Sequence, residues 1–345
     1  MLEEIHEQPV VLDRTLRSER DAAVEIRKAL AVRPPRAIVL VARGTSDNAA
    51  QFGRYLLELK TGIPVSLAAP SIITLYGREV NYSDCLVVAI SQSGESTDTN
   101  LVLESARRQG AVTVGITNEA SSSMASIAEH MLLVHAGRER SVAATKTYTG
   151  QMMALYLLAW AMGGAGIEMD DLDRLSAHAA AALRTEDEIQ RLAERYRFME
   201  STVVLGRGLN YANAFEFSLK LMETCAVVAE RFSSADFLHG PIAMVGQQFP
   251  VFAFVPGGPT WATMKLMIDK VRETTTETLL VTDESNREAS ALSKRCVVIP
   301  DFIADETLTP IPYIIPAQLL AAHLAEEKGM DADHPRGLTK VTRTL

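Results

Sequence analysis

The sequence of 345 residues predicts an α/β fold made of two similar units, each a parallel sheet covered by helices on both faces. Its length exceeds what one hydrophobic core usually holds, which favours two domains. Short apolar runs alternate with longer helical patterns in both halves of the chain. An Arg-Gly pair also follows an apolar run twice, within 41–46 and again within 204–209, which indicates a faint internal repeat.

The first half holds short apolar runs that have the composition and length of buried strands. These runs are Ala37–Ala42, Cys85–Ile90, Val112–Ile116 and Met131–His135. Helical patterns begin between them, near Ser46, Thr97 and Ser121, and a longer one runs from Lys146 to about Met162. Near-continuous apolar strands separated by helices are typical of a parallel sheet that is buried on both faces.

The second half repeats this plan after a charged, Ala-rich helical stretch, Asp170–Arg195, which we expect to connect the two units. Its predicted strands are Thr202–Leu205, Val251–Val255, Thr278–Val281 and Cys296–Ile299, with helices beginning near Asn210, Pro259, Asn286 and Ile311. The expected domain limits are a helical segment over 1–30, a first domain over 31–165, a connecting helix over 166–197, a second domain over 198–330 and a C-terminal tail over 331–345.

Composition and charge exclude several classes of protein. The net charge of −9 argues against a nucleic-acid surface, but it leaves room for a small phosphorylated ligand. No apolar run approaches the roughly 20 residues of a membrane span, and the chain opens without an apolar signal segment, so we expect a cytoplasmic protein. Cys85, Cys225 and Cys296 lack metal-ligand spacing and are expected to be reduced core residues. We therefore expect no metal and no cofactor.

The stretch Ser91-Gln92-Ser93-Gly94-Glu95-Ser96 carries the clearest chemical signal, because it lies between a predicted strand and a predicted helix. Free N–H groups and the dipole of a helix attract an anion at that place, and hydroxyl groups add donors. Ser46 has the same position after the first predicted strand. A Ser-rich N-cap and turn would have the same composition, so composition alone leaves a phosphate site and a structural turn equally open.

Further candidates lie in the second half. Lys220 and Glu223 share one face of a predicted helix with largely apolar neighbours, so they form either a common surface ion pair or a buried charged pair with a purpose. His239 lies in a loop beside Gly240 and Pro241, where a histidine is more often structural than catalytic. The polar tail with Lys340 is either a frayed terminus or a segment that folds over a pocket.

Taken together, these motifs resemble the sugar isomerase (SIS) domain family, in particular the isomerase half of the glutamine–fructose-6-phosphate amidotransferases. The likeness spans nearly the whole chain, through Glu4–Pro9, ISQSGES at 90–96, VAATKTYTGQ at 142–151, LGRGLNYANAFEFSLKLMET at 205–224, HGPIAM at 239–244 and DADHPRGLTKV at 331–341. The resemblance implies two tandem SIS domains, each a three-layer, flavodoxin-like α/β/α unit.

The resemblance also implies roles for single residues. The sugar phosphate would be bound by Ser46, Ser91, Gln92, Ser93 and Ser96, the last standing where Thr is usual, with the Val142 backbone along the sugar. Glu223 would move a proton between C1 and C2, beside Lys220. His239 would open the sugar ring, contributed across a homodimer, and the tail would bring in Lys340. The implied chemistry needs no metal.

The implied activity is that of an amino-sugar-phosphate isomerase and deaminase, which converts glucosamine 6-phosphate to fructose 6-phosphate and ammonia. The deaminating direction is expected because the chain opens directly at the isomerase half, without a glutaminase domain. Three departures from the family pattern, Ala144, Asp236 and Gly337, keep other substrates open, namely galactosamine 6-phosphate or a fructosamine 6-phosphate adduct. A sugar-phosphate sensor without turnover is the remaining alternative.

Overall fold

The computed structural model describes residues 1–275, 277–301 and 305–340, so residues 341–345 of the predicted tail lie outside the described residues. The chain forms two compact units. The first unit consists of Val10–Glu139, Lys146–Arg174 and the described residues from Thr339 onward. The second unit consists of Met1–Pro9, Arg140–Thr145 and Leu175–Leu338.

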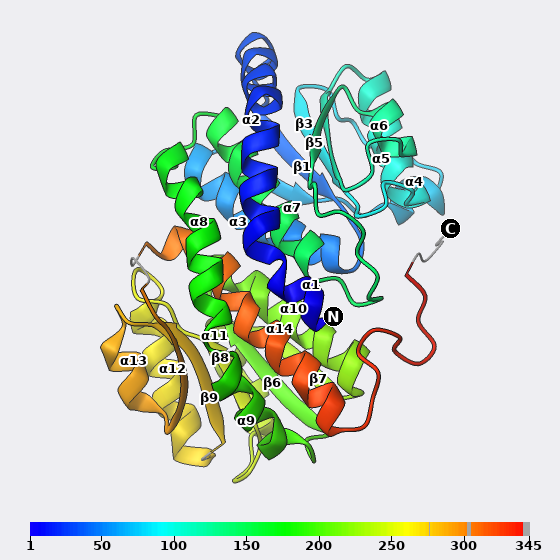
Figure 1. Ribbon diagram of the computed structural model, residues 1–345. Coiled ribbons are helices and arrows are strands. Elements are labelled where there is room, and N and C mark those ends of the chain that lie inside the picture. The colour runs from blue at the N-terminus through cyan, green and yellow to red at the C-terminus, as the bar shows by residue number, and fades with distance from the viewer. Residues whose placement is uncertain (276, 302–304, 341–345) are drawn as a thin grey trace. The chain divides into compact units, whose positions relative to one another are not determined.

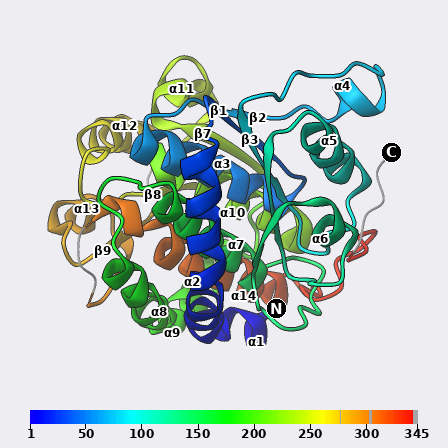
Figure 2. The same ribbon diagram turned by 90° about the horizontal axis from the view of Figure 1, so that it is seen from above.

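The first unit is built on a parallel sheet with the strand order β2-β1-β3-β4-β5. Its strands are β1 (Ala37–Val41), β2 (Val65–Leu67), β3 (Cys85–Ile90), β4 (Val112–Thr117) and β5 (His130–Leu133). Its helices are α2 (Gln8–Val32), α3 (Thr45–Thr61), α4 (Ser71–Thr74), α5 (Thr97–Arg108), α6 (Ser123–Ile127) and α7 (Lys146–Ala161). Helices α3 and α7 cover one face of the sheet, and α5 and α6 cover the other (Figures 1 and 2).

The second unit repeats this arrangement with the order β10-β9-β8-β6-β7. Its strands are β6 (Ser201–Gly206), β7 (Val228–Ser233), β8 (Val251–Phe254), β9 (Thr278–Asp283) and β10 (Arg295–Ile299). Helix α14 (Pro310–Glu327) packs on both α9 (Glu186–Tyr196) and α10 (Tyr211–Cys225). Helices α11 (Ser234–Leu238), α12 (Trp261–Thr274) and α13 (Arg287–Leu292) lie on the other side of the sheet (Figure 1). The short helix α1 (Leu2–His6) packs against α14. The predicted α/β fold class, with two parallel three-layer units, is therefore confirmed.

One predicted element is wrong. The single connecting helix expected over 166–197 is two helices, α8 (Met169–Leu183) and α9, with a break at Arg184 and Thr185. The backbone N–H and the hydroxyl of Thr185 both donate hydrogen bonds to the Ala182 carbonyl, at 3.1 and 2.7 Å. The three residues that follow are Glu186, Asp187 and Glu188, and acidic side chains are favoured in the first turn of a new helix.

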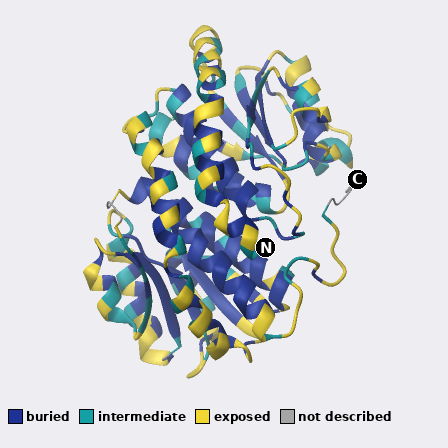
Figure 3. Ribbon diagram, viewed as in Figure 1, coloured by how far each residue is buried: buried dark blue, intermediate teal, exposed yellow. Residues whose placement is uncertain are grey.

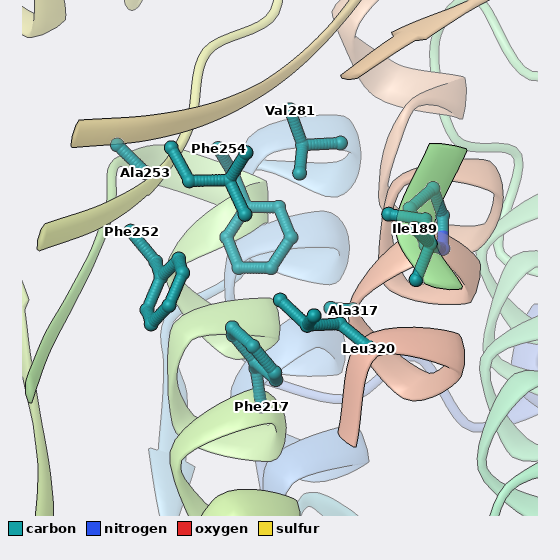
Figure 4. Close-up of a pocket in the computed structure, with 10 residues that line it drawn as sticks. Ile189, Phe217, Phe252, Ala253, Phe254, Val281, Ala317 and Leu320 are labelled. Atoms are coloured by element: carbon teal, nitrogen blue, oxygen red, sulfur yellow. The ribbon is translucent and has the colours of Figure 1, made fainter. Parts of the chain in front are cut away.

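The cores lie on both faces of each sheet, where the inner strands are almost continuously buried (Figure 3). Figure 4 shows a small apolar gap in the core of the second unit, where Phe217 of α10, Leu320 of α14 and Phe252 of β8 face one another. Its volume of about 10 Å³ is at the lower limit for one water molecule, so it is a packing gap and not a ligand site. All three cysteines are free thiols, and burial raises the pKa of Cys225 to about 11. Among the described residues, no helix has both the length and the apolar character that crossing a membrane requires.

Candidate functional site

The strand order places a topological switch point in the first unit. Strands β1 and β3 are neighbours, yet the chain continues from β1 outward to β2 and from β3 in the opposite direction to β4. The carboxyl ends of two such strands flank a topological switch point, where open α/β sheets bind their ligands. The loops at this point lead into the N-termini of α3 and α5. Ser46 lies in the first turn of α3, and Ser91–Ser96 form the loop before α5.

The serines after β3 both shape the loop and keep donors for a ligand. The Ser91 and Ser93 hydroxyl oxygens accept hydrogen bonds from the backbone N–H groups of Gly94 and Glu95, at 3.2 and 3.3 Å. The Ser96 oxygen accepts a bond of 2.9 Å from the Thr99 hydroxyl, and Ser96 is the N-cap of α5 without a side-chain cap bond. In each case the oxygen accepts, so the hydroxyl hydrogen remains able to donate. The turn and the anion-binding interpretations are therefore compatible.

The shape of this loop is held by its backbone. The Gln92 carbonyl accepts bonds of 3.1 Å from the Asn118 N–H and from the Thr117 hydroxyl. Gly94 has a φ of +66°, and a Cβ there would collide with Ser122. Only glycine fits both the backbone conformation and the space, so the loop is pre-formed.

Ser46 is buried in the first turn of α3, and its hydroxyl oxygen accepts a bond of 2.9 Å from the side-chain amide of Gln151 on α7. The amide oxygen of Gln151 is buried without a hydrogen-bond partner among the described residues. Sequence reasoning missed Gln151, although it ends one of the motifs that carry the family resemblance. It is the residue that fixes the orientation of Ser46.

The predicted tail residue Lys340 also belongs to the first unit, where its ammonium group lies 2.8 Å from Glu139 Oε2. The Glu139 side chain is fully buried, and the same carboxylate accepts bonds from the backbone N–H and the hydroxyl of Thr147, at 3.1 and 2.7 Å. Glu139 thus joins the tail lysine to the first turn of α7. Nothing in the local sequence around Glu139 marked it as a partner of the tail.

The acid and base candidates Lys220 and Glu223 lie on α10 in the second unit. The Lys220 ammonium is 2.6 Å from Glu223 Oε2 and 3.4 Å from Glu216 Oε1. The side chains of Lys220 and Glu216 are fully buried, whereas that of Glu223 is 23% exposed. The interpretation as an ordinary surface pair is therefore wrong. A buried cation holds a carboxylate that still reaches solvent, which is the arrangement expected of a positioned proton carrier.

The remaining predicted residues of the second unit are His239 and Val142. His239 is exposed and follows the short helix α11, and its neighbour Asp236 accepts a bond of 2.6 Å from the Ser233 hydroxyl that caps the same helix. Asp236, which departs from the family pattern, thus has a local structural role. The Val142 N–H donates to the Asp333 carbonyl at 3.0 Å. No group of three His, Cys, Asp or Glu side chains within 1–275, 277–301 and 305–340 could hold a metal ion.

The predicted site residues thus fall into two sets. Within the first unit the structure pairs Ser46 with Gln151 and Lys340 with Glu139, and the serine loop belongs to the same unit. Within the second unit it brings together Lys220 and Glu223, while His239 and Val142 lie on other segments of that unit. The first set offers donors to an anion, and the second offers a positioned carboxylate.

Comparison with known proteins places this arrangement in a family. The SIS domain matches residues 32–161 and again 199–327. The chain is 35% identical over 356 residues to the glutamine–fructose-6-phosphate aminotransferase (isomerizing) of Pseudomonas aeruginosa, covering 99% of the chain and 58% of that protein. For the enzyme of the same name from Aquifex aeolicus the identity is 33% over 352 residues, covering 99% and 57%.

The chain therefore spans less than two thirds of these relatives. Among solved structures, the C-terminal domain of glucosamine-fructose-6-phosphate aminotransferase from Francisella tularensis superimposes with a TM-score of 0.86 at 29% identity, covering 97% of this chain and 98% of that one. The two matched segments coincide with the two parallel sheets and the helices that flank them. This chain belongs to the SIS domain family, the family of the phosphosugar isomerases, and contains two copies of the domain.

Proposed function

We propose that this protein is an amino-sugar-phosphate isomerase and deaminase that converts glucosamine 6-phosphate to fructose 6-phosphate and ammonia. The observation that carries the proposal is the Lys220–Glu223 pair, a fully buried ammonium group 2.6 Å from a partly exposed carboxylate. Family membership and the likeness to aminotransferases named for fructose 6-phosphate support the choice of substrate.

Glu223 is the proposed proton carrier. In the open-chain substrate its carboxylate removes the proton from C2, which gives an enolamine, and returns that proton to C1. The product is a ketose with an imine at C2, which water hydrolyses to fructose 6-phosphate and ammonia. The proton is conserved within this transfer, so no oxidant or reductant is needed. Lys220 contributes by holding the carboxylate in one orientation, and Glu216 offsets the buried charge of Lys220.

The other residues have supporting roles in this scheme. The phosphate is bound by the hydroxyl groups of Ser46 and of the loop Ser91–Ser96, at the N-termini of α3 and α5. His239 opens the sugar ring, contributed from the second copy of a homodimer in the cytoplasm, and Lys340 balances negative charge that develops on a sugar oxygen. The pairing of Lys340 with the buried Glu139 supports an ordered position for this lysine rather than a frayed one.

Galactosamine 6-phosphate or a fructosamine 6-phosphate adduct is the alternative substrate. Ala144 favours it, because the family pattern has a serine there and a methyl group offers no hydrogen bond to a sugar hydroxyl. A substrate with a different C4 configuration or a substituted nitrogen needs a different set of polar contacts.

The test is the release of ammonia and the formation of fructose 6-phosphate from glucosamine 6-phosphate, measured for the wild type and for Glu223→Gln. We expect the variant to lose about a hundredfold or more in kcat, since it keeps the shape of the side chain but cannot carry the proton. Glu230→Gln, at an exposed glutamate of β7, is the matched control and should retain full activity. Equal turnover by wild type and Glu223→Gln would rule out the assigned role. Turnover of only galactosamine or fructosamine phosphates would favour the alternative substrates, and saturable binding without any turnover would favour a sensor.

A further inference from the structure

Arg43 lies at the switch point of the first unit and has no part in the site described so far. It follows β1 by two residues and precedes Ser46 by three. Its Nε and Nη2 groups donate to the same oxygen of Asp98, Oδ2, at 3.2 and 2.5 Å. Asp98 is the second residue of α5, the helix that begins directly after Ser91–Ser96. The guanidinium group therefore lies at the N-terminal turn of the helix that the serine loop leads into.

The geometry of this pair leaves one edge of the guanidinium group open. Nε and Nη2 form its side edge, and both are directed at Asp98, whose side chain is only 3% exposed. The Arg43 side chain is 48% exposed, so Nη1 and the second hydrogen of Nη2 remain for another acceptor. The other oxygen of Asp98 is buried without a partner among the described residues, so the carboxylate uses a single oxygen to hold the arginine.

We propose that Arg43 is a ligand of the substrate's phosphate group and that Asp98 is the residue that positions it. The inference rests on the proposed function, because it assigns the phosphate to the crevice between β1 and β3. A guanidinium edge matches two phosphate oxygens, and the buried anchor removes most of the rotamer freedom that the side chain would otherwise lose on binding.

The local charges fit this assignment. Asp98 and Asp47 are both acids in the first turn of a helix that follows β3 or β1, and Arg43 interacts with both of them. Burial raises the pKa of Asp47, and the nearby Arg43 acts in the opposite direction. Arg43 thus supplies a positive charge beside two carboxylates that would repel a phosphate dianion. The hydroxyl groups of the serine loop are neutral donors and cannot offset that repulsion.

The test is a calorimetric titration of the full chain with inorganic phosphate, for the wild type, Arg43→Gln, Arg43→Lys and Asp98→Asn. We expect Arg43→Gln to weaken phosphate binding about tenfold or more, since a charge-assisted hydrogen bond is lost. Arg43→Lys should lose less, because it keeps the charge but not the two-point contact. The phosphate affinity of Asp98→Asn should lie between those of the wild type and Arg43→Gln. Arg54→Gln, at an exposed arginine of α3, should bind as the wild type does.

The same variants are then assayed with the sugar phosphate, and a ligand role predicts a raised KM with kcat nearly unchanged. Equal phosphate affinity for the wild type and Arg43→Gln would overturn the proposal, as would a wild type that binds no phosphate. Thermal unfolding of each variant identifies a merely structural role, which would lower the Tm without changing the phosphate affinity of the folded protein, and this result also contradicts the proposal. The titration does not depend on turnover. If Arg43→Gln loses phosphate affinity while the wild type releases no ammonia, the proposed function fails and the role of Arg43 stands.

Discussion

The two sheets have the same strand order, yet their switch points are filled in different ways. In the first unit, the ends of β1 and β3 lead to serine hydroxyl groups and to Arg43. In the second unit, the ends of β6 and β8 lead to glycines, and the carboxylate of Glu306 lies against them. Glu306 Oε2 accepts a bond of 3.0 Å from the N–H of Thr260, the N-cap of α12. A Cβ built on Gly258 would lie 2.9 Å from the same oxygen.

The second crevice therefore contains an anionic group of the protein itself, at the helix N-terminus where an α/β sheet would otherwise receive a ligand. Glu306 is buried, and it comes from the short 3₁₀ helix Glu306–Leu308 that precedes α14. One fold has thus been used twice, once with a crevice lined by donors and once with a crevice closed by a carboxylate. Topology fixes where a site can form, and a few side chains decide whether it is available.

The largest expected effect comes from Gly94→Ala, which breaks the pre-formed loop of the first crevice. The new methyl group meets Ser122 and forces a side chain onto a φ of +66°, so we expect a loss of about 2–4 kcal/mol in the free energy of unfolding. Phosphate affinity should fall with it. Denaturant unfolding and phosphate titration measure the two effects.

Gly62→Ala is the matched control for this substitution. Gly62 has a φ of +71° at the end of α3, but a Cβ there would meet nothing within 4 Å. Gly62→Ala should therefore lower the free energy of unfolding only through backbone strain, by about 1 kcal/mol, and should leave phosphate binding intact. If both variants lose the same stability, the close contact with Ser122 does not constrain the loop.

A smaller effect is expected in the second crevice. Glu306→Ala removes the acceptor of the Thr260 N–H and leaves a void, so we expect a loss of about 1–3 kcal/mol in the free energy of unfolding. Glu306→Gln keeps an acceptor oxygen of nearly the same shape and should stay within about 1 kcal/mol of the wild type. Denaturant unfolding of the three proteins measures both. A Gln variant as unstable as the Ala variant would show that the negative charge, and not the acceptor, holds the crevice closed.

Sequence reasoning found the fold because the buried strands of parallel sheets are continuous apolar runs. It missed β2 and β7, which pair with β1 and β6 at the sheet edges. Strand β2 has only three residues, and β7 carries two adjacent charged residues, Glu230 and Arg231, that interrupt its apolar pattern. Neither pattern stands out from a loop or an exposed helix turn.

The candidate site was predictable only where it is local in the sequence. The loop Ser91–Ser96 is contiguous and lies between a strand and a helix, so its role could be argued directly from the order of residues. The partners that give the site its geometry are distant: Gln151 lies 105 residues from Ser46, and Glu139 lies 201 residues from Lys340. Asp98 lies 55 residues from Arg43. Contacts across such separations follow from the packed structure and leave no periodic signal in the chain.

The smallest expected effect is the pH dependence of the closed crevice. Burial raises the pKa of Glu306 above its ordinary value of 4.5, and the hydrogen bond from the Thr260 N–H only partly opposes this. The folded chain therefore holds the proton of Glu306 to a higher pH than the unfolded chain does. Below 4.5 the carboxyl is neutral in both states, and its full contribution to stability is present.

As the pH rises through the raised folded value, that contribution is lost, because the unfolded chain releases the proton more readily. The free energy of unfolding of the wild type, measured relative to Glu306→Gln, should decrease as the pH rises above about 4 and become constant above the raised folded pKa, since the amide does not titrate. Urea unfolding of both proteins across this range measures the difference. A difference that instead increased with pH would mean that the second switch point stabilises the ionised carboxylate, as an anion-binding site would. The two switch points would then differ only in the anion that each one binds.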